Sequence, residues 1–192
     1  LYSPDVESPR AEHDLVAAAA AGDADAFADL VRRHGPRVRA TCLRIVGDDA
    51  GADDCAQDAF AKAWRALGGF DRRSAFATWL YRIATNEALQ AVRRRRPQEV
   101  LVEEAPAAAV SREPGPGIDR IARAEVRDVV RRRLLELPEM LRIPVVLRDV
   151  EEWSNEEIAT ALELSVPAAK ARIHRGRMRL RELLAQDFPE RA

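Results

Sequence analysis

The sequence predicts an all-α protein of two small helical domains joined by a flexible linker. Apolar residues recur at steps of three or four, nine glycines in 192 residues rarely interrupt them, and no convincing alternating strand pattern occurs. This length suits one large or two small domains. Residues 97–117 lack an amphipathic period and hold four Pro and four Glu, which is typical of an acidic linker. We therefore expect domains at 12–96 and 118–186, a disordered segment at 1–11 and a tail at 187–192.

The stretch SNEEIATALELSVPAAKARIHRGRMRLRELL predicts two helices with a tight break between them. Ser154 and Glu157 have the spacing of a capping box at the start of the first helix. Ser165 can cap the second helix, with Pro167 in its first turn. Residues 164–181 carry six Lys/Arg and no Asp/Glu, which is typical of a helix-turn-helix whose second helix enters a DNA major groove. The alternative is a helical hairpin whose charged face is only solvated.

The second of these helices should have one buried and one basic face. The apolar stripe at helical spacing is Val166, Ala169, Ile173, Gly176, Leu180 and Leu183. Opposite it we expect Lys170, Arg172, Arg175, Arg177, Arg179 and Arg181, with His174 among them.

Five helices are expected in the first domain. One begins at Leu15 and ends at Gly22, and Asp23 or Asp25 caps the next. Pro36 is expected to open a third helix, which Gly47 ends. The helix after it should bury Ala52, Cys55, Ala56, Ala59, Phe60, Ala63 and Leu67, and expose Asp53, Asp54, Gln57, Asp58 and Lys62. The fifth follows a loop at 68–71.

Residues 48–58 contain five Asp and no Lys or Arg. Such a cluster can hold a metal, but solvation and compensation of the helix dipole are commoner causes. The spacings give no closed ligand set, so we expect neither a metal nor a cofactor. An enzyme that uses these carboxylates would need a paired base, a nucleophile or a phosphate loop, none of which is present. A docking face for a basic partner fits best.

Aromatic and basic residues lie near one another in the sequence after residue 69. Ser74 is the expected N-cap of a helix that runs to about Val92. Aromatic rings beside arginines suit unpaired bases, because rings stack on bases and cations bind phosphates. The alternative is that Phe76 and Trp79 are simply core residues. Arginines 93–96 either hold phosphate or solubilise the helix end, which Pro97 stops.

The second domain should begin with a long helix whose outer face is rich in arginine. It starts at Ile118, and Leu137-Pro138-Glu139 resets the chain. Another apolar element follows, which Pro144 bends or delays.

Cys42 and Cys55 predict reduced, buried thiols in a cytoplasmic protein, with a disulfide or a metal site as the lesser alternative. No signal-peptide core or long apolar run occurs, so we expect no membrane insertion.

Two sets of motifs together resemble one family. ADDCAQDAFAKAWRAL followed by SAFATWLYRIATNEA resembles region 2 of the sigma factors of bacterial RNA polymerase. LPEMLRIPVVLRDVEEWSNEEIATALELSVPAAKARIHRGRMRLREL resembles their region 4. The layout of two domains and a short linker is similar to the extracytoplasmic-function (ECF) group of the sigma-70 family. The resemblance covers roughly residues 12–186.

The resemblance implies a transcription initiation factor that reads the −10 and −35 elements of promoter DNA and helps to melt it. The β′ coiled coil of core polymerase would contact Asp53, Asp54, Gln57, Asp58, Phe60 and Trp64. Flipped bases of the −10 element would meet Phe70, Arg72, Arg73, Ser74, Phe76, Trp79, Arg82 and Asn86. The −35 major groove would meet Ser165, Pro167, Ala168, Lys170, Ala171, Arg172, His174 and Arg175.

Further partners follow from the same resemblance. Residues 140–150 would meet the β flap of the polymerase, and the linker would thread toward its active-site and RNA-exit channels. An anti-sigma factor commonly holds members of this group inactive. The resemblance implies no catalytic residue.

Two positions depart from the family pattern. Glu163 stands where the turn usually has Gly, so a left-handed residue there would be strained by ~1 kcal/mol. Ala169 replaces a larger aliphatic residue. The alternative function is a helix-turn-helix transcriptional regulator, which would bind duplex DNA without being a polymerase subunit.

Overall fold

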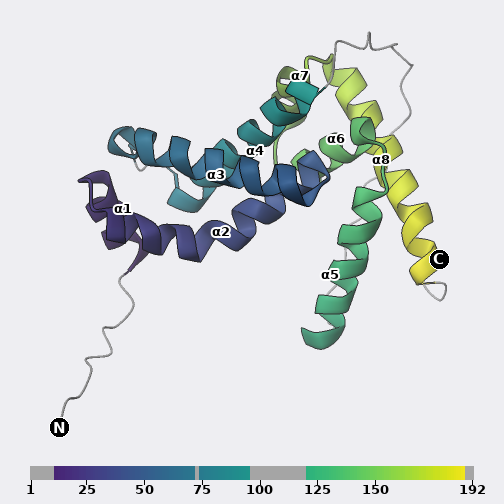
Figure 1. The fold of residues 1–192 in the computed structure, drawn as a ribbon. Coiled ribbons are helices and arrows are strands. Elements are labelled where there is room, and N and C mark those ends of the chain that lie inside the picture. Colours follow the sequence, from purple (N-terminus) through teal and green to yellow (C-terminus); the bar gives the residue numbers. More distant parts are fainter. Residues whose placement is uncertain (1–10, 72–73, 96–119, 189–192) are drawn as a thin grey trace. The chain divides into compact units, whose positions relative to one another are not determined.

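The computed structural model describes residues 11–71, 74–95 and 120–188 of the chain. Within these ranges it contains eight α-helices, one short 3₁₀ turn and no strand, which confirms the all-α prediction (Figure 1). The chain divides into two compact units, one ending at Arg95 and the other beginning at residue 96. The predicted N-terminal segment 1–11, linker 97–117 and tail 187–192 lie outside the described residues except for Ala11, Asp187 and Phe188. The tail is predicted one residue too early, because α8 continues to Asp187.

The first unit is a bundle around one long helix. Its elements are α1 (Glu12–Ala20), α2 (Ala24–Val46), α3 (Asp49–Ala66), the 3₁₀ turn η1 (Leu67–Gly69) and α4 (Phe76–Arg95). Helices α2, α3 and α4 pack against one another, and α1 packs on α2 (Figure 1). The core between them includes the fully buried Leu15, Leu30, Val38, Ile45, Leu67 and Leu80.

Short polar and glycine residues set the helix ends, largely as predicted. Of the two aspartates proposed to cap α2, Asp23 is the N-cap, and its carboxylate accepts the N–H groups of Asp25 and Ala26, both at 3.0 Å. Gly47 ends α2 in the left-handed conformation, with φ 95°. The predicted end of α2 is therefore confirmed.

The prediction that Pro36 opens a new helix is wrong, because α2 continues through it from Ala24 to Val46. Proline removes one i→i−4 hydrogen bond and crowds the preceding turn. The helix survives because buried side chains hold it on both sides of the proline, Leu30 and His34 before it and Val38 and Cys42 after it. Local helix-breaking chemistry is overcome by tertiary packing.

The prediction for the start of α4 is also wrong. The helix begins at Phe76, and the carbonyl of Ala75 accepts the first intrahelical bond, from the N–H of Trp79 at 3.2 Å. The capping position therefore falls on Ala75 and not on Ser74. The helix also continues to Arg95, one turn beyond the predicted end at Val92. Its last turn is held by an ion pair to α3 that the sequence pattern does not reveal.

The second unit is arranged around α8. Its helices are α5 (Arg120–Leu135), α6 (Glu139–Asp149), α7 (Asn155–Leu162) and α8 (Val166–Asp187), and α8 contacts the other three. Pro144 lies inside α6 without delaying it. An ion pair from Arg133 to Asp187, 2.6 Å from Nε to Oδ2, joins α5 to the end of α8. The hydrogen bond from Arg133 lowers the pKa of Asp187.

Helices α6 and α8 cross at Gly176. A Cβ at this position would lie 2.6 Å from Cγ2 of Val145 and 2.9 Å from the carbonyl oxygen of Leu141. The second contact is backbone, which cannot rotate away. Only glycine therefore permits this approach of the two helices.

The start of α7 and the turn between α7 and α8 confirm the predicted capping chemistry. Ser154 Oγ accepts the N–H of Glu157 at 3.1 Å, and the Glu157 carboxylate accepts the N–H of Ser154 at 2.9 Å. Ser165 Oγ then accepts the N–H of Ala168 at 3.3 Å and caps α8.

The strain expected at Glu163 is also present in this turn. Glu163 has φ 56° and ψ 44°, and the N–H of Leu164 bonds to the carbonyl of Ala159 at 2.9 Å. These are the features of a Schellman motif, in which glycine is the preferred left-handed residue.

We predict that Glu163→Gly stabilises the second unit by roughly 1 kcal/mol, because glycine adopts a positive φ without a steric cost. Hydrogen exchange of the α7 and α8 amides measures the change. Glu156→Gly is the matched control, since it replaces an exposed glutamate inside α7 and should destabilise by about 0.5–1 kcal/mol. Unchanged or faster exchange in Glu163→Gly would contradict the turn geometry.

We further predict that Gly176→Ala destabilises the second unit by about 1–3 kcal/mol, because the new methyl group overpacks the α6–α8 crossing. Chemical denaturation followed by helical circular dichroism measures it. In Gly35→Ala the added Cβ meets nothing within 4 Å, so this helical control should be neutral or stabilising. Equal effects of the two substitutions would refute the close contact.

Candidate functional sites

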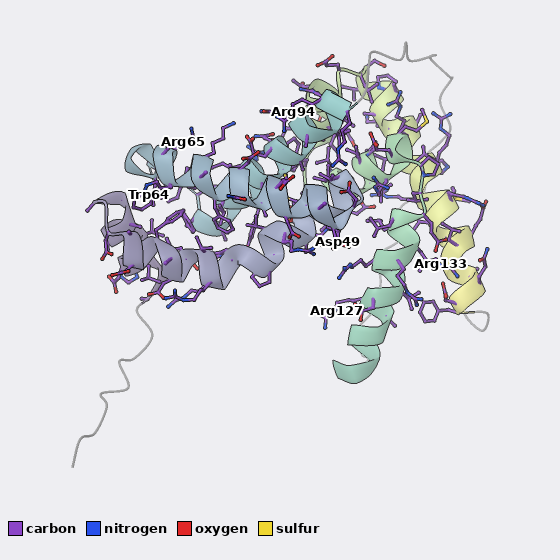
Figure 2. The ribbon with its side chains drawn as sticks, in the orientation of Figure 1. Asp49, Trp64, Arg65, Arg94, Arg127 and Arg133 are labelled. Atoms are coloured by element: carbon purple, nitrogen blue, oxygen red, sulfur yellow. The ribbon has the colours of Figure 1, made fainter. Side chains whose placement is uncertain are left out.

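The outer face of α3 carries the predicted docking residues. Asp53, Asp54, Gln57 and Asp58 are exposed, whereas Ala52, Cys55, Ala59 and Ala63 are buried against the bundle. The predicted division of this helix into two faces is confirmed, except that Ala56 and Phe60, which were predicted to be buried, are half-buried. Figure 2 shows Asp49 and Trp64 near opposite ends of α3, so the polar face spans most of the helix.

An aromatic group lies at the end of this face. Trp64 is 36% exposed, and its ring lies 4.8 Å from Phe27 of α2. Phe60, which is half-buried, makes an edge contact with Phe27 at 6.4 Å. The Phe60 ring is thus partly used inside the bundle, while Trp64 presents apolar surface to solvent.

Arg39 of α2 neutralises part of the acidic face. Its Nε lies 2.5 Å from Asp53 Oδ1, and its Nη2 lies 2.6 Å from Asp49 Oδ1. The hydrogen bond from Arg39 lowers the pKa of Asp53. Asp54 and Asp58 make no ion pair among the residues that the structure describes. The carboxylates available to a partner are therefore fewer than a count of residues 48–58 indicates.

A shallow hollow of about 530 Å³ lies between α3 and α4 beside this face. It is lined by Asp58, Lys62, Arg65, Ala66 and Glu87. Lys62 Nζ and Glu87 Oε1 are 2.6 Å apart across it. Because both charges are already paired, the hollow adds little net charge to the docking face.

Arg95 has an internal role at the end of α4. Its Nη1 lies 2.5 Å from Oδ2 of Asp48, and Oδ1 of that aspartate also accepts the N–H of Gly51 at 2.8 Å. Both hydrogen bonds lower the pKa of Asp48, the one from Arg95 more strongly. Arg95 Nη2 lies so close to Gly51 that a Cβ at this position would clash with it. Arg95 therefore ties α4 to the start of α3, although it is exposed, as are Arg93 and Arg94.

The predicted base-contacting aromatic residues form one cluster at the start of α4. The rings of Phe70 and Trp79 are 4.9 Å apart, and Phe76 lies 6.1 Å from Phe70 and 5.8 Å from Trp79. Phe76 is only 5% exposed, so it is a core residue and cannot offer a ring face to a base. Phe70 and Trp79 are half-buried. The structure therefore separates one supporting ring from two accessible ones.

Polar residues continue from this cluster along α4. Arg82 and Asn86 are exposed, three and seven residues after Trp79, and thus share its side of the helix. Ser74 is exposed just before the helix. Arg72 and Arg73 lie outside the described residues.

On α8 the structure corrects the predicted basic face. Ser165, Pro167 and Lys170 are exposed, and Ala168, His174 and Arg175 are half-buried. Arg172 is 8% exposed and Ala171 3%, so neither lies on an open face. Arg172 follows Ala169 by three residues and precedes Gly176 by four, which places it beside the buried stripe.

Two more arginines of α8 have internal partners. Arg177 Nε lies 3.0 Å from Asp149 Oδ2 of α6, and this hydrogen bond raises the pKa of Arg177. Arg179 pairs with Glu182 at 2.8 Å. In the described part of the chain, Lys170 and Arg181 are exposed and form no ion pair. The cationic groups open to a ligand are fewer than the sequence suggests.

The two thiols are free and buried, as predicted. The Sγ atoms of Cys42 and Cys55 lie 4.0 Å and 3.9 Å from the carbonyl oxygen of Ala84. No group of His, Cys, Asp and Glu that could hold a metal occurs in the described ranges. Among the same residues no helix is long and apolar enough to cross a bilayer.

Comparison with known proteins adds independent support. The family model of Sigma-70 region 2 matches residues 30–98, and that of Sigma-70 region 4 matches residues 127–180. The ECF RNA polymerase sigma factor SigW of Bacillus subtilis is 35% identical over 170 residues, which cover 85% of this chain and 91% of that protein.

Two solved structures are also similar. One is that of CnrH in complex with the cytosolic domain of CnrY, with 32% identity and a TM-score of 0.53 over 93% of this chain and 99% of that one. The other is the sigma factor RpoE with the anti-sigma factor NepR from Bartonella quintana, with 25% identity and a TM-score of 0.51 over 84% and 98%. Two family models in the expected order and relatives that match along most of their length agree with the geometry: the chain belongs to the extracytoplasmic-function group of the sigma-70 family of RNA polymerase sigma factors.

Proposed function

We propose that this protein is an alternative sigma factor that binds core RNA polymerase, directs it to promoters through their −10 and −35 elements, and helps to melt the DNA. It would act in the cytoplasm and without catalytic chemistry of its own. The observation that carries the proposal is the combination of three surfaces in one chain. They are an acidic outer face on α3, an accessible aromatic pair at the start of α4, and a capped helix-turn-helix.

The acidic face of α3 is the proposed polymerase-binding surface. Asp54, Gln57 and Asp58 present exposed polar groups to a basic helical partner such as the β′ coiled coil. Trp64 supplies an exposed aromatic anchor at the end of the same helix. Asp53 contributes through its bridge to Arg39, which a partner arginine would have to displace or share.

The accessible ring pair is the proposed site for the −10 element. Phe70 and Trp79 offer apolar rings on which an unpaired base can stack, and stacking offsets the few kcal/mol that unstacking costs. Arg82 and Asn86 extend this side of α4 with a cation for phosphate and an amide for a base edge. The buried Phe76 packs against both rings of this pair. We keep Arg72, Arg73 and Ser74 in the proposed site, because they directly precede α4 in the sequence.

The start of α8 is the proposed reader of the −35 element. Ser165, Pro167, Ala168 and Lys170 lie in its first turns, where a recognition helix meets base edges. Lys170 is the exposed cation of this group, and His174 and Arg175 follow on the next turn. Ala171 and Arg172 are buried beside this surface and would support it without contacting bases directly.

Two further partners belong to the proposal. The β flap of the polymerase would meet the second unit around α6. A protein inhibitor is also expected, because RpoE of Bartonella quintana was solved with an anti-sigma factor.

Run-off transcription with bacterial core polymerase, with and without the protein, tests the proposal on a pool of promoter fragments. Initiation that depends on the protein is expected. Tight sequence-specific binding to duplex DNA without core enzyme, and no initiation with it, would instead identify a helix-turn-helix regulator.

We predict that Asp54→Arg combined with Asp58→Arg lowers initiation roughly tenfold or more, because like charges would face the basic partner. Co-purification with core enzyme should fall in parallel. Asp14→Arg combined with Asp25→Arg is the control, with the same change in charge on α1 and α2. Equal loss in both pairs would indicate a nonspecific charge effect and contradict the assigned surface.

We predict that Lys170→Ala weakens holoenzyme binding to promoter duplex that contains the −35 element. If Lys170 reads a guanine, discrimination at one base pair should fall by about 1–3 kcal/mol. If it holds a phosphate, the salt slope should decrease by about 1 for every sequence. Arg179→Ala, at an exposed arginine paired with Glu182, should change neither quantity.

A further inference from the structure

His34 is a buried histidine that none of the assigned surfaces includes. It lies on α2 in the first unit and is 7% exposed. Its Nδ1 is 3.0 Å from the hydroxyl oxygen of Tyr81 on α4. Its Nε2 is 3.2 Å from Glu12 Oε2 on α1, although this pair lacks the alignment of a hydrogen bond. One imidazole therefore contacts groups from two other helices.

The geometry favours one tautomer of this ring. If Nε2 carries the hydrogen, the positive edge of the ring lies near the Glu12 carboxylate, 3.2 Å away, and Nδ1 accepts the Tyr81 hydroxyl hydrogen. In the opposite tautomer the bare Nε2 lone pair would face a carboxylate, which is repulsive. The hydrogen bond from the Tyr81 hydroxyl thus fixes the orientation of the His34 imidazole ring.

The histidine ring also contacts the aromatic cluster at the start of α4. It meets Phe76 edge to face, with ring centroids 5.4 Å apart and an interplanar angle of 65°. Phe76 in turn contacts both Phe70 and Trp79. A continuous path of ring contacts therefore runs from His34 through buried Phe76 to the accessible pair.

Tyr81 is held from its other side as well. The guanidinium carbon of Arg37, an exposed residue of α2, lies 4.3 Å from the centre of the tyrosine ring. The hydroxyl of Tyr81 is bound by His34 and its ring by Arg37. Both restraints come from α2, so this helix holds Tyr81 in place.

Core filling alone does not account for a histidine here. An apolar residue of similar size would fill the space without leaving Nε2 buried and poorly satisfied. A buried polar group fixes orientation where its partners are directional.

We propose that His34 is a positioning residue for the −10 site. Its bond to Tyr81 and its contact with Phe76 hold the Phe70–Trp79 pair in the orientation that receives an unpaired base. The inference rests on the proposed function, since it assigns a second layer to the same site.

Two variants remove the interactions separately. Tyr81→Phe deletes only the hydroxyl and keeps the ring beneath Arg37, so it is expected to fold. His34→Leu removes both the hydrogen bond and the ring contact. Ile45→Ala is the control, a fully buried change on α2 eleven residues further along the chain.

The first measurement is the affinity of reconstituted holoenzyme for a single-stranded oligonucleotide with the nontemplate −10 sequence of a promoter from the run-off pool. We expect a loss of about tenfold in His34→Leu and a smaller loss in Tyr81→Phe, because base stacking supplies much of this binding. Affinity for core polymerase and for a −35 duplex should be unchanged. Ile45→Ala should leave all three affinities in the same ratio as wild type.

The second measurement separates positioning from stability. With Trp64→Phe and Trp153→Phe, Trp79 is the sole tryptophan of the three in the chain. Time-resolved anisotropy of the free protein should show faster local rotation of Trp79 in His34→Leu and Tyr81→Phe, but not in Ile45→Ala.

The outcomes separate the two proposals. The positioning role would be overturned if His34→Leu and Tyr81→Phe lose no more −10 affinity than Ile45→Ala and leave the rotation of Trp79 unchanged. The sigma function would remain intact in that case. If the wild-type protein supports no initiation in the run-off assay, both the sigma function and the positioning role are overturned.

Discussion

One helix in each unit is enclosed by three others, and this enclosure decides which surfaces remain available. In the first unit α2 contacts α1, α3 and α4, and in the second α8 contacts α5, α6 and α7. Each helix packed on α2 buries the face that contacts α2 and exposes the opposite face to solvent. The acidic face of α3 is exposed for this reason. Helix α8 is itself enclosed by three helices. Its solvent-exposed basic surface is narrow because Arg172 is buried beside the apolar stripe.

Ion pairs within each unit further limit the charges that a partner can use. Arg39 holds Asp49 and Asp53, Arg95 holds Asp48, and Arg177 holds Asp149. Each of these pairs joins two helices, so the same side chains that give the chain its segregated charge also fix its packing. Exposed ion pairs of this kind contribute little free energy individually. Their larger effect is to reduce the number of charged groups that each docking face offers to a partner.

The helix caps and turns were predictable because their chemistry is local. Asp23, Ser154, Glu157 and Ser165 satisfy backbone groups two or three residues away, a distance that the sequence states directly. The strained Glu163 was predictable for the same reason. The predictions made from Pro36 and Ser74 were wrong, because the continuity of α2 and the start of α4 depend on which side chains pack against the other helices.

The sequence by itself determined the helical class, the order of the two units, and the residue types at each candidate surface, since periodicity and capping are encoded within a few residues. Only the tertiary structure decided which of those residues are open. It buried Phe76 and Arg172, paired Asp53 with Arg39, and brought His34 against Tyr81, forty-seven residues away. Contacts between distant helices depend on how whole faces pack, and no short stretch of sequence carries that information.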